Sequence, residues 1–367
     1  MKRPLEIKYM QMALRLAKKG EGRTYPNPMV GAVIVRDGKI VGRGYHKKAG
    51  EDHAEITALK EARGKCRGAS MFVTLEPCDH YGKTPPCSLR IIESGIKTVY
   101  ASMKDPNRLT GGKGINRLKK AGIDVKVGLM REESAFVNRK YIKFITTGLP
   151  YVTVKLAQSI DGKIAARDGS SKWISGEDSR NYTRKLRPSY DAIMVGANTV
   201  VKDDPYLLDS QRKGYGVTRI VVDSRLRIPE KSNILKTRSK SPVIIATTRL
   251  APQARMSKLE AMDGIEVIRT RVKEGRVSLG GLLKKLGQRE MVNVLVEGGG
   301  ELVGSMVDEG LVDEAMFFVS PKIIGGEYSS VKGKGAANIK KALDLEQVEI
   351  KRKGDDIFVR GMVCSRG

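Results

Sequence analysis

The stretch from Ser70 to Glu93 reads SMFVTLEPCDHYGKTPPCSLRIIE. Its first eight residues have the pattern of a buried strand, and the residues after Cys87 have the apolar spacing of a helix. A polar loop that ends in two prolines lies between them. We therefore expect Cys78 to follow a strand and Cys87 to begin a helix.

The segments on either side continue this alternation. The residues around Asp37-Gly38 alternate between apolar and polar, which predicts a hairpin. Helices are predicted near 5–19, from His53 onward and at 115–122, and strands at 98–105 and 123–128. Strands that alternate with helices predict a three-layer α/β/α domain, in which a sheet lies between helices.

Three short motifs in this part carry residues that bind metals: His53-Ala54-Glu55, Pro77-Cys78 and Cys87. Imidazole and thiolate suit zinc, and three protein ligands leave a fourth position for water. Zinc lowers the pKa of such a water enough to give hydroxide near neutral pH. Glu55 stands two residues after His53 at a predicted helix start, so it lies beside the metal without binding it and can pass protons to a leaving amine.

The order H-x-E, P-C and a second cysteine is the signature of zinc deaminases. It predicts His53, Cys78 and Cys87 as zinc ligands and Glu55 as the catalytic acid and base. The alternative is that the cysteines form a structural pair and His53 is a surface residue. It is weak, because a chain with only three histidines has one in this position.

Two further residues of these types are expected to have no role in catalysis. His46 is predicted to be an ordinary loop residue, and Cys66 a buried or half-buried thiol.

The second part of the chain begins after a predicted linker at 146–151, where Gly148 and Pro150 interrupt regular structure. We expect two domains, residues 1–147 and 148–367, of which the second is also α/β. Its strands are predicted at 151–165, 192–197, 219–224, 243–248, 265–270, 292–298, 315–321 and 356–363, and its helices at 177–187, 279–288 and 300–309.

The composition indicates a soluble globular protein, with 40% hydrophobic and 30% charged residues. The chain has no apolar run long enough for a transmembrane helix, and its basic N-terminal segment predicts an amphipathic helix rather than a signal peptide. Four cysteines in 367 residues are too few for a disulfide scaffold. A cytoplasmic location without a membrane partner is therefore expected.

The formal net charge of +27 would attract anions, among them nucleic acids, phosphorylated small molecules and dinucleotides. The basic residues are spread along the whole chain, and aromatic residues make up only 5% of it. Few stacking platforms for single-stranded nucleic acid are therefore available.

At the residues quoted above, the chain resembles the RibD family of riboflavin biosynthesis, in which a pyrimidine deaminase is fused to a pyrimidine reductase. Eight residues separate Cys78 from Cys87 and the loop ends in Thr-Pro-Pro-Cys, as in that family, whereas many deaminases of nucleic acids have two residues between the cysteines. The segments YPNPMVG at 25–31 and DPN at 105–107 also match.

The resemblance continues through the second half and covers nearly the whole chain. It implies a fold similar to dihydrofolate reductase, which binds NADPH without the motif G-x-G-x-x-G, and we find no such motif after a strand. The matching segments are KLAQSIDGK at 155–163, SKWIS at 171–175, VGANTV at 195–200, DDP at 203–205, VDS at 222–224 and EGGG at 297–300.

For the first half, the resemblance implies deamination of 2,5-diamino-6-ribosylamino-4(3H)-pyrimidinone 5′-phosphate, a small phosphorylated pyrimidine. The ring carbon that bears the 2-amino group would be attacked by the zinc-activated water, so that ammonia leaves and a uracil ring remains. Asn27, His80, Asp105 and Asn107 would hold the ring and the sugar by hydrogen bonds.

For the second half, the resemblance implies hydride transfer from NADPH to C1′ of the ribose, which gives a ribityl chain. Lys155 and Glu297 are the candidate catalytic groups at the reacting centre. Ser171, Arg187 and Leu207 would face the substrate, with Arg187 on its phosphate. NADPH would be bound by Ala157, Trp173, Thr199, Asp203, Ser224, Gly298, Gly299, Gly300 and Glu301, the glycines before a helix letting backbone N–H groups reach phosphate.

The chain departs from the family pattern in a few places. The family usually has Leu-Thr-x-Arg after Asp-Asp-Pro, and its arginine helps to bind the substrate phosphate, but Ser210 takes that position here and Arg212 or Lys213 would have to replace it. Asp79 also stands where a serine is usual.

Two alternatives to a bifunctional enzyme stay open. One is an RNA or nucleobase deaminase with a basic C-terminal domain that binds nucleic acid, which the net charge motivates. The other is a protein with one inactive site, which Ser210 motivates. The leading hypothesis expects no nucleic-acid partner, and by family resemblance it expects a homodimer formed through the second domain.

Overall fold

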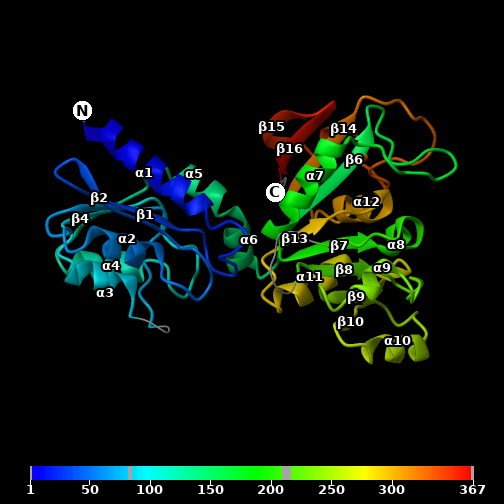
Figure 1. Cartoon of the computed structure of the whole chain (residues 1–367), viewed down its shortest axis with the longest axis horizontal. Helices are drawn as coiled ribbons and strands as arrows, with labels where there is room; N and C mark the ends of the chain where they lie inside the picture. Colours follow the sequence, from blue (N-terminus) through cyan, green and yellow to red (C-terminus); the bar gives the residue numbers. More distant parts are fainter. Residues whose placement is uncertain (1, 82–84, 209–215, 365–367) are drawn as a thin grey trace. The chain divides into compact units, whose positions relative to one another are not determined.

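The computed structural model describes residues 2–81, 85–208 and 216–364. The chain divides into two compact units, Met1–Gly148 and Leu149–Gly367, each with a main sheet and hydrophobic clusters of its own (Figure 1). Within the described ranges, no helix combines the length and the apolar character needed to cross a membrane.

The sheet of the first unit has the strand order β2-β1-β3-β4-β5. β1 pairs with β2 and with β3 in antiparallel fashion, whereas β3, β4 and β5 are parallel. The turn between β1 and β2 contains Asp37 and Gly38, both at positive φ (50° and 73°), which confirms the predicted hairpin. The strands are β1 (Gly31–Arg36), β2 (Lys39–Tyr45), β3 (Ser70–Val73), β4 (Thr98–Ala101) and β5 (Asp124–Val127).

Alternate residues of these strands are buried on opposite faces of the sheet, and helices cover both faces. Val33, Phe72 and Tyr100 pack in one cluster with α1 and α5, while their neighbours Ile34 and Val73 pack in another with α2, α3 and α4. The predicted three-layer arrangement is thereby confirmed. The helices are α1 (Lys2–Lys18), α2 (Ala54–Ala62), α3 (Cys87–Glu93), α4 (Lys113–Lys120), α5 (Arg131–Val137) and, last in this unit, α6 (Arg139–Thr147).

Two glycines of β2 bring α2 close to the sheet. A Cβ atom at Gly42 would lie 2.3 Å from the carbonyl oxygen of Ala58, and one at Gly44 would lie 2.2 Å from that of Ala54. Both contacts are with backbone, which cannot move aside as a side chain can. The start of α2, which carries His53 as its N-cap, is therefore fixed against β2.

The second unit contains a sheet of nine strands in the order β10-β9-β8-β7-β13-β6-β14-β16-β15. The strands from β10 to β14 in this order are parallel to one another, and β16 and β15 are antiparallel additions. Their bounds are β6 (Tyr151–Ser159), β7 (Ala192–Gly196), β8 (Thr218–Val222), β9 (Val243–Thr247), β10 (Ile265–Arg269), β13 (Asn293–Val296), β14 (Glu314–Ser320), β15 (Leu345–Lys353) and β16 (Asp356–Val363).

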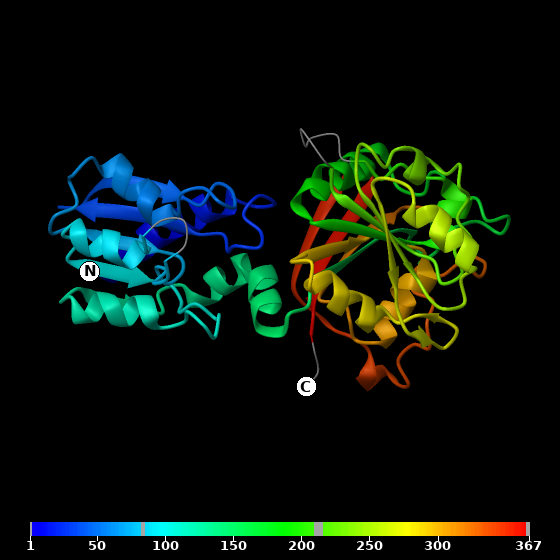
Figure 2. The same cartoon turned by 90° about the horizontal axis from the view of Figure 1, so that it is seen from below.

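Helices also cover both faces of this sheet (Figures 1 and 2). One buried cluster joins the strands to α11 and α12, a second joins them to α8, α9 and α10, and a third, smaller cluster lies under α7. The remaining elements are α7 (Glu177–Leu186), η1 (Arg187–Ser189), α8 (Ala197–Asp203), α9 (Asn233–Lys236), α10 (Gln253–Glu260), the hairpin β11 (Val272–Lys273) and β12 (Arg276–Val277), α11 (Leu279–Gly287), α12 (Gly300–Asp308) and η2 (Ile339–Lys341).

Every strand and helix predicted for the second unit is present, but the sequence analysis did not indicate the helices α8, α9 and α10, the short hairpin of β11 and β12, or the strand β15. This strand lies at the edge of the sheet, and its register against β16 shifts between Glu346 and Glu349. The shift breaks the strict two-residue alternation by which a strand is recognised.

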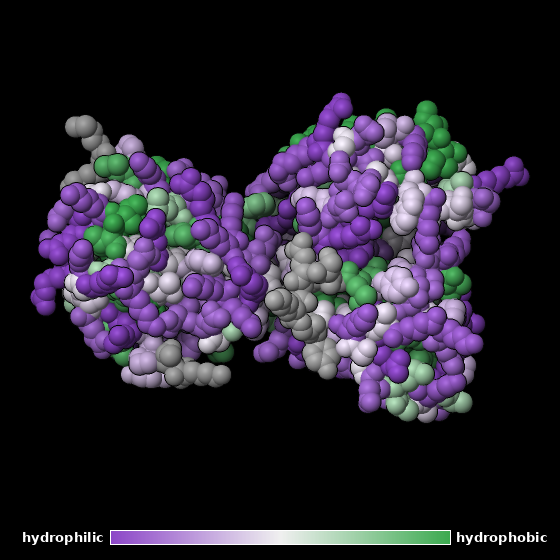
Figure 3. Space-filling view, viewed as in Figure 1, coloured by the Kyte–Doolittle hydropathy of each residue, from purple (hydrophilic) through white to green (hydrophobic). Residues whose placement is uncertain are grey.

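Most of the molecular surface visible in Figure 3 belongs to hydrophilic residues, and hydrophobic residues gather there in small groups. This distribution agrees with the balance of charged and hydrophobic residues in the sequence.

A leucine pair tests the core of the first unit. Leu118 of α4 is fully buried, so Leu118→Ala is expected to lower the free energy of unfolding of that unit by about 2–5 kcal/mol through the cavity that it leaves. Leu5→Ala on α1, where the leucine is 54% exposed, is the control and should have a much smaller effect. Urea unfolding of the first unit measures the free energy of unfolding of both variants. Equal losses in the two variants would contradict the assignment of this core.

Candidate metal centre and reductase cavity

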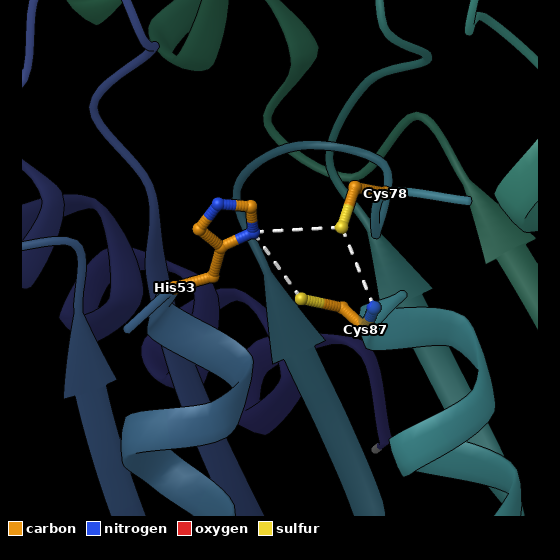
Figure 4. A group of neighbouring side chains, drawn as sticks. All are labelled: His53, Cys78 and Cys87. Carbon is orange, nitrogen blue, oxygen red and sulfur yellow. Dashed lines mark hydrogen bonds between the residues drawn. The ribbon is translucent and has the colours of Figure 1, made fainter. Parts of the chain in front are cut away.

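Three elements bring the predicted metal ligands together in the first unit. His53 is the N-cap residue of α2, Cys78 follows the end of β3, and Cys87 is the first residue of α3 (Figure 4). His53 Nδ1 lies 3.5 Å from Cys78 Sγ and 3.3 Å from Cys87 Sγ. The backbone N–H of Cys87 donates a hydrogen bond to Cys78 Sγ at 3.4 Å. The ligand atoms of all three residues lie within 4.8 Å of one another.

The spacing of these atoms fits a tetrahedral zinc ion. A nitrogen and a sulfur bound to zinc at the usual distances and at a tetrahedral angle are about 3.6 Å apart. Both distances from His53 Nδ1 to a sulfur are close to this value. The donor set of one imidazole and two thiols leaves a fourth position for water, as catalytic zinc sites do.

The ionisable groups of this cluster shift one another's pKa values, so that the two thiols differ in charge. A hydrogen bond with the Cys87 thiol and one with His53 lower the pKa of Cys78 to about 4 in spite of burial. Hydrogen bonding to Cys78 raises the pKa of His53 to about 9, and hydrogen bonding together with burial raises the pKa of Cys87 well above that of an ordinary thiol. Without metal at pH 7, the cluster therefore contains an imidazolium, a thiolate and a thiol.

Glu55 lies in the first turn of α2 and is only 3% exposed. Burial raises the pKa of its carboxyl group to about 7, and the nearby Cys78 thiolate adds to this effect. Its interactions with His53 and with the Cys87 thiol oppose part of this rise. A carboxyl group that is half protonated near neutral pH can both accept and donate a proton.

His46 is the residue of this site that sequence reasoning missed. It lies in a loop, as predicted, but it is 2% exposed and its ring packs edge-on against that of His53, with 5.3 Å between the ring centroids. Its Nδ1 lies 3.2 Å from the carbonyl oxygen of Asp52 and its Nε2 lies 3.4 Å from Asn27 Nδ2. Burial lowers the pKa of His46. The motif Gly-Tyr-His gave no signal that the loop folds back onto the metal centre.

Three of the four predicted substrate contacts, Asn27, Asp105 and Asn107, form hydrogen bonds with other residues of the first unit. Asn27 lies against His46, and the Asp105 carboxylate accepts hydrogen bonds from the Asn107 N–H (3.0 Å) and from the Tyr141 hydroxyl (3.1 Å). The fourth, His80, is exposed and directly precedes the last residue described before the gap at 82–84.

The predicted catalytic pair of the second unit lies on neighbouring parallel strands. Val154 of β6 is opposite Val296 of β13, so the next residues, Lys155 and Glu297, stand side by side. Glu297 forms a bidentate ion pair with Arg187, in which Nε donates to Oε1 at 2.7 Å and Nη2 donates to Oε2 at 3.1 Å. The guanidinium of Arg187, expected on the substrate phosphate, is thus shared with Glu297.

Burial and neighbouring charges both act on this cluster. Burial lowers the pKa of Lys155, and the Arg187 charge lowers it further, while Glu297 opposes the change. Burial by itself would raise the pKa of Glu297, but Arg187 and Lys155 outweigh it and hold this pKa below its ordinary value. Glu297 is therefore a carboxylate, and the Lys155 ammonium gives up its proton more readily than an exposed lysine.

A cavity of about 940 Å³ lies beyond the carboxyl ends of β7, β8 and β13. Parallel α/β sheets commonly bind ligands at this end of their strands. One predicted substrate contact, Ser171, lines the cavity. Six predicted NADPH contacts line it as well, namely Thr199, Asp203, Ser224, Gly299, Gly300 and Glu301.

The details of the cavity suit a dinucleotide with phosphates. Gly299 is the N-cap of α12, so the first N–H groups of that helix have no acceptor within the helix. A Cβ atom at Gly300 would lie 2.3 Å from the Ser329 carbonyl oxygen, which explains a glycine at this place. Basic side chains line the cavity as well, namely Lys202, Arg225, Arg227, Lys273, Arg276, Lys332 and Lys334.

Other predicted residues of the second unit do not line this cavity. Trp173 is 62% exposed, with the Arg180 guanidinium 4.6 Å from its ring centroid. Ala157 packs against the cluster of Met316, Phe318 and Phe358, and Leu207 is buried in the core beneath α8. The contacts predicted for these residues, and for Gly298, stay predictions. Ser210, Arg212 and Lys213 lie outside the described residues.

Two protein-family models match the chain. Residues 4–103 match the cytidine and deoxycytidylate deaminase zinc-binding region, and residues 150–359 match the RibD C-terminal domain.

Curated relatives match along almost the whole length. The riboflavin biosynthesis protein RibD of Aquifex aeolicus (strain VF5) is 41% identical over 361 residues, which cover 97% of this chain and 98% of the relative. RibD of Escherichia coli (strain K12) is 37% identical over 363 residues, covering 95% of this chain and 97% of the relative.

Solved structures agree over both units. RibD of Acinetobacter baumannii in its form 1 superimposes with a TM-score of 0.85 at 33% identity, covering 99% of this chain and all of that one. The diaminohydroxyphosphoribosylaminopyrimidine deaminase/5-amino-6-(5-phosphoribosylamino)uracil reductase of Thermotoga maritima gives a TM-score of 0.84 at 33% identity with the same coverage. Because both halves match in one chain, these similarities do not favour the alternative of a deaminase that binds RNA through its second half.

The charge states of the cluster predict how many protons zinc displaces. At pH 7 zinc binding should release about two protons, one from His53 and one from Cys87, because both pKa values are raised and both groups must be deprotonated to bind. The affinity should therefore increase with pH through the His53 pKa of about 9 and continue to increase above it, because the pKa of Cys87 is also raised. Titration calorimetry in buffers of different ionisation enthalpy measures the number of protons that are released when zinc binds.

The matched controls for this prediction are two cysteine variants. Cys87→Ser should reduce zinc affinity and lower the number of protons released, whereas Cys66→Ser, at a buried thiol outside the cluster, should change neither. Zinc binding that releases no proton at pH 7 would contradict the charge states given above.

Proposed function

The chain belongs to the RibD family, the bifunctional deaminase–reductases of riboflavin biosynthesis, and from this premise we propose which of its residues carry each of the two reactions. The deaminase domain is residues 1–147 and the reductase domain, which has the fold of dihydrofolate reductase, is residues 148–367. The division of the chain into compact units near residue 148 supports these bounds.

The deaminase domain acts on 2,5-diamino-6-ribosylamino-4(3H)-pyrimidinone 5′-phosphate. His53, Cys78 and Cys87 hold the zinc ion, which when bound makes a water nucleophilic near neutral pH. Glu55 accepts a proton from this water and delivers a proton to the 2-amino group, which leaves as ammonia while the ring carbon keeps the oxygen. The observation that carries this assignment is a buried carboxyl group with a pKa of about 7 beside a cluster of one imidazole and two thiols.

The substrate is oriented by side chains at the edge of the metal centre. Asn27, held against His46, and the pair Asp105 and Asn107 offer amide and carboxylate groups to the ring and the sugar. His80 is assigned, by family resemblance, to the same hydrogen-bonded contacts with the ring and the sugar.

The reductase domain uses NADPH, which when bound in the cavity supplies the hydride. The C1′ carbon of the ribose gains this hydride as its bond to the ring oxygen breaks, and the ring oxygen gains a proton. Lys155 is the source of that proton, because its burial makes the ammonium more acidic. Glu297 holds Lys155 and Arg187 at the site through its charge.

The proposed assignments for the substrate and cofactor of this domain follow the family. Arg187 and Ser171 bind the substrate together with Leu207, and the first turn of α12 binds phosphate of NADPH through backbone N–H groups. Arg187 is assigned to the substrate phosphate by family resemblance, and its guanidinium donates two hydrogen bonds to the Glu297 carboxylate.

We also propose a cytoplasmic homodimer formed through the reductase domain. The edge strand β15 supports this assembly, because it carries exposed Val348 and Ile350 (49% and 67%) and has a neighbour on one side only. Two copies of the strand in antiparallel order can also place Glu346 opposite Lys353.

The role of Glu55 is tested by Glu55→Gln. Ammonia release from the diaminopyrimidinone phosphate should fall by about 10²-fold or more, because the amide cannot carry the proton. Reduction of the deaminated substrate should continue at the normal rate, followed through NADPH absorbance. Glu61→Gln, at an exposed residue of the same helix that pairs with Arg43, is the control. Unchanged ammonia release in Glu55→Gln would exclude the proposed role.

The role of Lys155 is tested by Lys155→Met, which keeps the length and packing of the side chain without its charge. NADPH oxidation with the deaminated substrate should fall by about 10²-fold or more. Ammonia release should stay at the wild-type rate. Lys185→Met, on the exposed side of α7, is the control. A variant that keeps full reductase activity would show that another group supplies the proton.

A further inference from the structure

Glu76, two residues before the metal ligand Cys78, is buried at 6% exposure and accepts hydrogen bonds from three backbone N–H groups. Its Oε2 accepts from Asp105 at 3.1 Å and from Gly112 at 2.8 Å, and its Oε1 accepts from Ile115 at 3.1 Å. These donors are 29, 36 and 39 residues away in the sequence. One carboxylate thus joins the metal-binding loop to a distant segment.

The backbone of the same residue makes a further link. The Glu76 N–H donates to the carbonyl oxygen of Met103 at 2.9 Å. A Cβ atom at Gly114 would lie 1.9 Å from the carbonyl oxygen of Pro77, so the start of α4 rests directly on the residue after Glu76. Neither segment can shift without breaking these contacts.

The sheet explains why the two segments meet here. β3 and β4 are parallel neighbours, with Val73 opposite Ala101, so their carboxyl ends share one edge of the sheet. The chain after β3 leads to Cys78, and the chain after β4 leads to Asp105 and Asn107. Glu76 therefore lies between the metal ligand and two proposed substrate contacts.

α4 has no cap of its own that would replace this carboxylate. Its N-cap is Gly112, which has no side chain to accept a hydrogen bond. Backbone N–H groups that donate to a charged acceptor form stronger hydrogen bonds than those between neutral groups, and a buried N–H left without an acceptor is costly. The position of the start of α4, and of the Asp105 backbone, thus depends on Glu76.

We propose that Glu76 is a positioning residue for deamination, which holds Asp105 and Asn107 in register with the metal centre. The Asp105 carboxylate in turn accepts the Asn107 N–H, so the position of one residue is passed to the other. A displacement of a substrate contact by about 1 Å can reduce turnover by about 10²-fold. This inference rests on the proposed function of Asp105 and Asn107 as substrate contacts.

The test uses the full chain with Glu76→Gln and Glu76→Ala. Glu76→Gln keeps one oxygen, which can still serve Asp105 and Gly112, while its NH₂ group faces the Ile115 N–H. Glu76→Ala removes both acceptor oxygens and with them all three hydrogen bonds. The kcat/KM of the deaminase should fall by about 10²-fold in Glu76→Ala, mainly through a higher KM, and by less in Glu76→Gln. Bound zinc and its rate of release to a chelator should stay at wild-type values.

The controls separate this inference from a loss of folding and from a failure of the proposed function. Reductase kinetics of the same variants should stay at wild-type values if the rest of the chain is folded. Glu93→Gln, at an exposed glutamate of α3 that pairs with Arg90, is the control variant and should leave the KM of the deaminase unchanged. If the wild-type chain releases no ammonia from the substrate, the proposed function fails. If the wild type is active and the KM does not change in Glu76→Ala, or if zinc is lost as the KM rises, the positioning role is overturned.

Discussion

Parallel pairing of neighbouring strands is the constraint on which both candidate sites depend. In a parallel pair the carboxyl ends lie at the same edge, so side chains that follow two strands meet even when they are far apart in sequence. β3 and β4 bring the metal-binding loop beside Asp105 in this way. β6 and β13 place Lys155 beside Glu297 across a register that is set by backbone hydrogen bonds.

Burial then gives the grouped side chains their chemistry. The carboxyl group of Glu55 has little access to water, which raises its pKa to about 7, and burial likewise lowers the pKa of Lys155. Each of these shifts moves the group toward a state in which it can transfer a proton. The Glu297 carboxylate stays charged because Arg187 and Lys155 compensate for its burial.

Much of the fold and of the metal centre could be predicted from the sequence, because those predictions depended on local patterns. The Asp37-Gly38 hairpin, the α/β/α layers and the cluster of His53, Cys78 and Cys87 all follow from periodicity, turn residues or motif spacing. β15 was missed because a register shift interrupts its alternation. The residues 209–215 are not described, so the question raised by Ser210 stays a prediction.

The sequence by itself determined which residue types are available, which elements they begin or end, and therefore the zinc ligand set. Only the tertiary structure decided the contacts between distant segments. It placed the buried His46 ring against His53, paired Arg187 with Glu297, and brought the Glu76 carboxylate to the start of α4. The reason is physical: a local pattern records how a segment folds and which side it buries, whereas the partner of a buried polar group depends on where the sheet brings other segments of the chain.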